Sequence, residues 1–210
     1  MSFQSILKLV LVVLLVSTVP AHANSADDEL NEARNIFLKG VDGDTRAVRQ
    51  AIRQFKALNA HNPDNPVYLA YLGASMTLKG RDAQNNLDKR RLTEDGLAKI
   101  DKALDYVANN HNVRSVEYLD TLLVAANSFI YIPSFFNRYE KGKLLLEEIL
   151  NHEDFSSMAA GYRAAAYFTA ALVAHGDGDD LEYRRYLSLA VETEPDGRNG
   201  KAAQRLLNEK

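Results

Sequence analysis

Cysteine is absent from the 210-residue chain. Its absence excludes disulfides, iron–sulfur clusters, thiolate zinc sites and cysteine nucleophiles. In an oxidising compartment the fold would therefore depend on its apolar core alone. That is feasible, because a chain of roughly this size buries about 70% of the surface that its unfolded form exposes.

Long apolar runs are also lacking, apart from one close to the N-terminus. There Lys8 precedes the apolar run Leu9–Val16, and Ala21-His22-Ala23 offers a small-residue cleavage site. A run of eight residues is well short of the ~20 that span a bilayer, which disfavours an uncleaved membrane anchor. The pattern predicts a signal peptide over residues 1–23, cleaved after Ala23. We expect residues 24–210 to form a single soluble periplasmic domain without a transmembrane span.

A strong excess of one charge is the third absence. Removing Lys8 leaves 24 of the 25 basic side chains against 28 acidic ones, a net charge of about −4. Nucleic-acid binding needs clustered Lys and Arg side chains that neutralise phosphates. We therefore expect no nucleic acid among the partners.

What the sequence does contain is helical periodicity, with no convincing strand alternation, so the predicted class is all-α. Gly-rich turns, prolines and capping residues divide the pattern into four pairs of helices and a short C-terminal helix. The expected helices are Ala26–Lys39, Thr45–Ala60, Pro66–Gly80, Glu94–Val107, Val113–Ser128, Tyr139–Leu150, Ser157–Ala174, Asp180–Glu194 and Gly200–Asn208. Asn65, Asn112, Asp180 and Asn199 are the expected N-terminal caps.

The helix that begins at Pro66 organises the rest of the prediction. Asn65 caps it, and Leu69, Leu72, Gly73 and Met76 share one face. Gly73 is small enough to let a neighbouring helix approach closely.

A three-residue pattern recurs in the second helix of each pair, with spacings of four and then three and with roughly 41 to 46 residues between successive copies. The copies are Ala51, Phe55 and Leu58; Gly96, Ile100 and Ala103; Gly142, Leu146 and Ile149; and Tyr183, Leu187 and Ala190. Together with Leu72-Gly73 and the turn from Ala60 to Pro66, this pattern resembles the tetratricopeptide repeat family. A generic helical repeat is the alternative. The spacing exceeds the usual 34 residues, so the second and third pairs must carry insertions. The stretch 81–93 in the second pair either extends one of its helices or forms a surface loop.

The resemblance implies a right-handed stack of about four helical hairpins, a TPR-like α-solenoid with a short C-terminal capping helix. It also implies a concave face, built by the first helices, that binds an extended peptide or a partner protein. Function would then be recognition and not catalysis.

The candidate partner-binding residues lie in the two insertions: Arg81, Asp82, Phe129, Tyr131, Phe135, Phe136, Arg138 and Tyr139. Equivalent places in their hairpins should bring both insertions to one edge of the stack. Exposed aromatic side chains flanked by arginine are typical of binding hot spots. The structural alternative, which we prefer, is that the apolar stretch fills a gap between the third and fourth pairs, with a local Arg81–Asp82 ion pair.

No catalytic constellation, cofactor motif or metal motif stands out. The histidines after residue 23 are far apart in sequence and are interpreted as capping or surface residues: His61, His111, His152 and His175. Neither His152-Glu153-Asp154 nor His175 with Asp177 and Asp179 has the ligand spacing of zinc or calcium sites.

Three hypotheses about function follow. The leading one is a non-catalytic exported scaffold or adaptor that binds a protein of the bacterial envelope. The alternative is a periplasmic binding protein for a small apolar or lipid-like ligand, held by the aromatic stretch and the alanine-rich fourth pair. An enzyme with a dispersed Glu, Asp or Tyr site is disfavoured, because no nucleophile, base and orienting group occur together.

Overall fold

The computed structural model describes residues 25–209, and within this range the chain is helical with no β-strand. The all-α class predicted from the periodicity is therefore confirmed. The elements are α1 (Ser25–Val41), α2 (Thr45–His61), α3 (Pro66–Arg81), α4 (Asn86–Asn109), α5 (Ser115–Tyr131), α6 (Tyr139–Asn151), α7 (Ala160–Gly176), α8 (Asp180–Thr193) and α9 (Arg198–Asn208), with short 3₁₀ turns η1 (Ser134–Phe136) and η2 (Phe155–Ser157).

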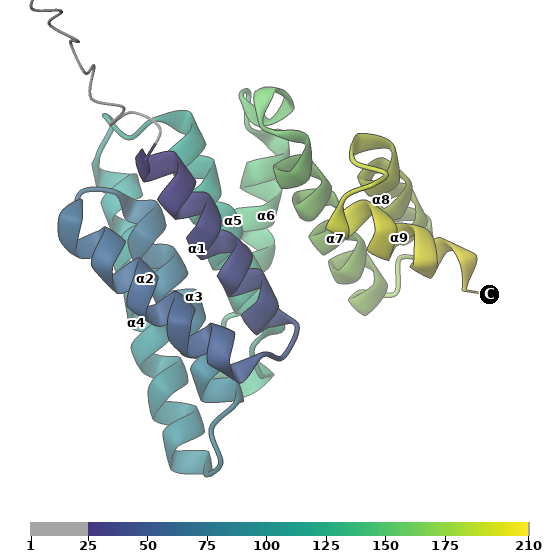
Figure 1. Ribbon diagram of the computed structural model, residues 1–210. Coiled ribbons are helices and arrows are strands. Elements are labelled where there is room, and N and C mark those ends of the chain that lie inside the picture. The colour runs from purple at the N-terminus through teal and green to yellow at the C-terminus, as the bar shows by residue number, and fades with distance from the viewer. Residues whose placement is uncertain (1–24, 210) are drawn as a thin grey trace, which may run out of the picture.

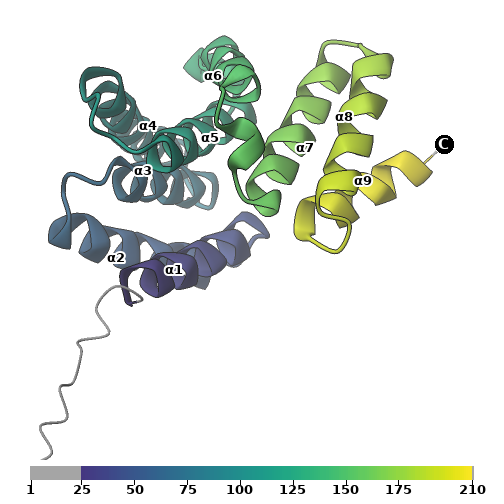
Figure 2. The ribbon, with the colours of Figure 1, turned by 90° about the horizontal axis from the view of Figure 1, so that it is seen from above.

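Consecutive helices pack against each other in pairs, and the pairs follow a curve (Figures 1 and 2). Figure 2 shows α3, α5 and α7 on the inner side of the curve and α4, α6 and α8 on the outer side. Helix α9 packs against both α7 and α8. The buried apolar side chains form a central cluster from α3 to α7, flanked by one cluster at each end of the array.

The recurring three-residue pattern lies at the contacts within this core. All of its members are buried except Leu58 and Tyr183, which are half-buried. Large members such as Phe55, Ile100, Ile149 and Leu187 are completely inaccessible to solvent. The repeated spacing thus marks the buried face of α2, α4, α6 and α8.

Two glycines allow α3 and α4 to touch through their backbones. A Cβ added to Gly73 would lie 2.6 Å from the carbonyl oxygen of Gly96, and a Cβ added to Gly96 would lie 2.6 Å from that of Gly73. Any larger side chain at either position would force the helices apart. The close approach expected at Gly73 is confirmed.

The start of α3 is as predicted, and α4 begins before Glu94, so most of the stretch 81–93 extends this helix. Asn65 accepts a hydrogen bond from the Val67 amide at 3.0 Å, and Pro66 occupies the first turn. Helix α4 begins at Asn86 and not at Glu94, since Asn85 accepts a hydrogen bond from the Asp88 amide. In the added turns Leu87 is exposed and Thr93 is buried, and charge pairs support the exposed face. No stripe of buried apolar residues therefore marks these turns in the sequence.

Three other predicted caps are wrong. The N-cap of α5 is Arg114 and not Asn112, and that of α9 is Gly197 and not Asn199. The N-cap of α8 is Asp179, which accepts a hydrogen bond from the Glu182 amide at 3.0 Å, and not Asp180. In α5 and α9 no side chain caps the first amides, so a search for capping residues places the boundary wrongly.

Two further helix boundaries differ from the prediction. Helix α7 begins at Ala160, because Ser157 belongs to the 3₁₀ turn η2. Helix α5 continues past Ser128 through Phe129 to Tyr131, so the first three residues of the expected apolar link belong to this helix. This stretch is apolar because Phe129 packs in the central core.

The predicted signal peptide and its cleavage site lie outside the described residues. Among the helices that the structure describes, none combines the length and the apolarity needed to cross a membrane.

Candidate functional site

The connection between α5 and α6 carries most of the predicted site residues, and it begins with a core residue. Phe129 is fully buried in the last turns of α5. The guanidinium carbon of Arg138 lies 5.3 Å from the centre of its ring, and Lys141 Nζ lies 5.4 Å from it. Cations at this distance are attracted to an aromatic ring. Phe129 is thus a core residue and not part of an exposed patch.

An ion-pair cluster attaches the same connection to α4. Arg138 donates two hydrogen bonds to Asp101, from Nη1 at 3.0 Å and from Nη2 at 2.6 Å. Lys141 Nζ donates a third to the same carboxylate at 2.9 Å. Bidentate arginine–carboxylate pairs fix orientation as well as distance. The base of the connection is therefore held firmly against the neighbouring pair.

Beyond this base, two aromatic side chains face solvent. Tyr131 is 60% exposed and Phe135 is 68% exposed. Phe136 is half-buried against the central core, and its ring centre lies 4.3 Å from that of Phe135. We call Tyr131, Phe135 and Phe136 the aromatic edge. Neighbouring apolar side chains that remain exposed together form the kind of surface patch through which proteins can bind partners.

The backbone of the aromatic edge is shaped by its own sequence. Pro133 precedes the 3₁₀ turn Ser134–Phe136, and Asn137 ends it in the left-handed conformation with φ 54°. The Asn137 amide donates a hydrogen bond to the Ser134 carbonyl at 2.9 Å. Asparagine tolerates this conformation better than most residues. The turn therefore presents Phe135 outward in a defined geometry.

Tyr139, the first residue of α6, connects the third pair to the fourth. Its hydroxyl lies 3.3 Å from where a Cβ would stand on Gly176, at the end of α7. Lys143 Nζ lies 5.5 Å from the Tyr139 ring centre and donates to Asp177 at 3.0 Å. Tyr139 thus packs at the junction of the two pairs.

Arg81 and Asp82 form the local ion pair that the structural alternative predicted, with Arg81 Nε donating to Asp82 at 2.8 Å. Arg81 also donates to the carbonyls of Gly40 and Val41, at 2.9 and 3.1 Å. These carbonyls belong to the last turn of α1, where a cation is favourable. The α3–α4 and α5–α6 connections lie on the same, lower side of the array in Figure 1, yet these contacts of Arg81 tie it to α1.

Sequence reasoning missed a buried ion pair on the inner side of the curve. Arg34 of α1 donates to the buried carboxylate of Asp120 on α5. The Arg34 guanidinium also lies 5.6 Å from the ring centre of Tyr71 on α3. Burial raises the pKa of Asp120, although the charge of Arg34 opposes that rise. The pair joins the first hairpin to the third.

Further polar bonds join α5 to α7. The Tyr162 hydroxyl donates to the Leu119 carbonyl at 2.7 Å, and the Thr169 hydroxyl donates to Asn127 Oδ1 at 2.7 Å. Through these hydrogen bonds the inner helices α5 and α7 contact each other directly. The one signal available in the sequence was Asp120 itself, a charge within the otherwise apolar face of α5.

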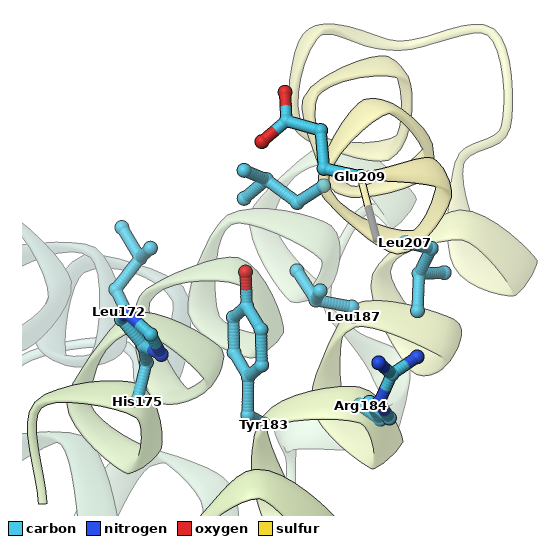
Figure 3. Close-up of a pocket in the computed structure, with 8 residues that line it drawn as sticks. Leu172, His175, Tyr183, Arg184, Leu187, Leu207 and Glu209 are labelled. Atoms are coloured by element: carbon cyan, nitrogen blue, oxygen red, sulfur yellow. The ribbon is translucent and has the colours of Figure 1, made fainter. Parts of the chain in front are cut away.

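A second candidate site is a hollow of about 290 Å³ between α7, α8 and α9 (Figure 3). Leucine side chains form much of its wall, including the fully buried Leu187. Tyr183 stands in it, with its ring centre 4.8 Å from that of His175. The polar residues Arg184 and Glu209 complete the lining.

Two of the histidines, His111 and His152, line one hollow together, whereas His61 and His175 are not part of it. His61, His111 and His175 are exposed, and the His61 ring lies 3.0 Å from the Ala57 carbonyl, one helical turn back. His152 is half-buried and accepts a hydrogen bond from the Asp154 amide at 3.1 Å. Over residues 25–209 no three His, Cys, Asp or Glu side chains are grouped as a metal site would need.

Comparisons with protein-family models, with curated proteins and with solved structures find no match to this chain.

Proposed function

We propose that this chain is a non-catalytic helical-repeat scaffold, exported to the bacterial envelope, that binds a partner protein through the aromatic edge. In this proposal the hairpins stack as in tetratricopeptide repeat proteins. The recurring buried pattern in α2, α4, α6 and α8 supports such a stack. The predicted signal peptide supports export.

The observation that carries the proposal is the contrast along one short segment. Phe129 is completely buried, whereas Tyr131 and Phe135 are 60% and 68% exposed. Burying apolar surface is worth about 25 cal/mol per Å², and an ordered segment loses little conformational entropy on binding. The hydrogen bonds of Arg138 and Lys141 to Asp101 and the turn that ends at Asn137 provide that order. A protein partner with a complementary apolar pocket would gain most from Phe135.

The test is a capture experiment in the source bacterium. We expect the double variant Tyr131→Ser/Phe135→Ser to lose a protein that the wild-type chain retains after crosslinking. The matched control is Leu181→Ser, because Leu181 is 79% exposed and lies on α8. Both variants should keep their unfolding free energy within about 0.5 kcal/mol, as surface substitutions usually do. Equal capture by all three proteins would contradict the proposal.

A second function is favoured by the hollow in Figure 3, namely binding of a small apolar ligand. Its volume is close to the lower end of ligand sites, about 300 Å³, and most of its wall is apolar. Native mass spectrometry, followed by denaturation, should then release a bound apolar compound. The variant Leu206→Trp would fill the hollow and abolish that release. Purified protein that releases no compound would contradict this function.

A further inference from the structure

The two ends of the curved array meet through one ion pair. Arg198 donates from Nη1 and Nη2 to the two carboxylate oxygens of Asp42, both at 2.6 Å. Asp42 lies in the turn after α1, and Arg198 is the first residue of α9. These residues are 156 positions apart in the sequence. Figure 2 shows the end of α1 and the start of α9 facing each other across the opening of the curve.

Arg198 is unfavourable for α9, and Asp42 is unfavourable for α1, although Asp42 also lies just before the N-terminus of α2, where an anion is favourable. A cation at a helix N-terminus and an anion at a helix C-terminus both oppose the helix dipole. Arg198 begins α9, whose first turn contains no acidic residue, and Asp42 directly follows the last residue of α1. The Arg198 hydrogen bonds lower the pKa of Asp42. The dipole of α9 gives no reason for a cation at Arg198, whereas the two hydrogen bonds to Asp42 across the opening do.

The pair is also weak enough to open. The side chains of Arg198 and Asp42 remain 44% and 58% exposed. Exposed ion pairs contribute about 0–1 kcal/mol, and salt screens them. The apolar clusters at the two ends of the array have no residue in common, so the core packing of one end does not depend on the other.

We propose that Asp42 and Arg198 form an electrostatic latch, which holds the two ends of the array together and sets the width of its inner side. Raised ionic strength, or a charged partner that competes for either residue, opens the latch and separates α1 from α9. This inference does not depend on the aromatic edge or on the adaptor function.

The chain has no cysteine, so distances across the opening can be measured with two introduced labels. Asn35→Cys on α1 and Gln204→Cys on α9 place spin labels at exposed, neutral positions. Pulsed electron paramagnetic resonance should show a short, narrow distance distribution at low salt. The distribution should become longer and broader at about 1 M salt, where the Debye length falls to roughly 3 Å.

Substitutions of Asp42 and Arg198 test whether this ion pair causes the change in distance. Arg198→Ala should lengthen the distance at low salt, and the charge exchange Asp42→Arg/Arg198→Asp should restore it. The control Arg185→Ala removes an exposed ion pair within α8 and should leave the distance unchanged. A distribution that Arg198→Ala does not alter, or a charge exchange that fails to restore the distance, would overturn the latch.

Discussion

At the scale of single residues, neighbouring aromatic side chains have opposite roles. Phe129 and Phe135 are six positions apart and are chemically identical, yet one is completely buried and the other is 68% exposed. The first belongs to the central core, and the second belongs to the aromatic edge. This difference in burial can be measured as a difference between the unfolding free energies of variants at the two positions.

Phe129→Ala should lower the free energy of unfolding by about 3–5 kcal/mol, because it leaves a cavity beneath the cations of Arg138 and Lys141. Phe135→Ala should change it by less than about 0.5 kcal/mol, because little of its surface is buried. Urea unfolding followed by circular dichroism measures both values. Similar losses in the two variants would mean that Phe135 also packs in the core.

The buried Arg34–Asp120 pair makes a second residue-scale prediction. Asp120→Leu should cost about 2–4 kcal/mol, somewhat below the usual figure for a broken buried pair, because Arg34 retains some exposure to solvent. The double variant Arg34→Met/Asp120→Leu should recover most of that loss, since neither charge is then left alone. A double-mutant cycle in urea supplies the coupling energy. Additive losses would contradict the pairing.

At the scale of helices, the sequence predicted most elements and misplaced several of their ends. Periodic apolar residues locate a helix because burial is what stabilises it, and Gly73 with Gly96 marked a true helix contact. The turns of α4 before Glu94 bury Thr93 but no apolar side chain, so no apolar pattern could reveal them. The N-termini of α5 and α9 were placed wrongly because no side chain caps them, so no capping residue marks where these helices begin.

The candidate site was predictable only in part. The composition of the stretch from Phe129 to Tyr139 indicated that the segment mattered, but not which side chains would be buried. That division depends on Asp101, which lies 37 positions before Arg138 and holds it in place. The Arg34–Asp120 pair spans 86 positions, so local patterns do not contain it.

The early start of α4 can be tested through its cap. Asn85→Ala removes the acceptor for the Asp88 amide, which lies 2.8 Å from Asn85 Oδ1. We expect a loss of about 1 kcal/mol and faster hydrogen exchange confined to the first turns of α4. Asn86→Ala, one position later, should change neither the free energy of unfolding nor the rate of hydrogen exchange. Unaltered exchange in Asn85→Ala would show that the helix does not begin there.

At the scale of the whole molecule, inner and outer helices form one curved array in which tyrosines supply many of the contacts between pairs. Burial and the neighbouring carboxylate of Glu148 raise the pKa of Tyr118 to about 12 from an ordinary value of 10.0. Burial also raises the pKa values of Tyr71 and Tyr162. The folded chain therefore keeps these protons in a pH range where the unfolded chain releases them.

Because the tyrosine pKa values are higher in the folded chain than in the unfolded chain, raising the pH should destabilise the fold. The contribution of these tyrosines to stability is complete below pH 10 and is lost as pH rises toward 12 and beyond, because the unfolded state then binds fewer protons. Urea midpoints should therefore fall between pH 9 and pH 11, roughly the range where free tyrosine ionises. Tyr118→Phe should show a smaller fall. A midpoint independent of pH would contradict the assignment.

Partner recognition by the aromatic edge is the central claim, and site-specific photo-crosslinking in living cells tests it most directly. A photoreactive phenylalanine analogue is placed at position 135 and, as a control of similar exposure, at position 181. The account predicts a discrete crosslinked adduct with one protein from position 135 and none from position 181. No adduct from position 135, or the same adduct from both positions, would contradict it.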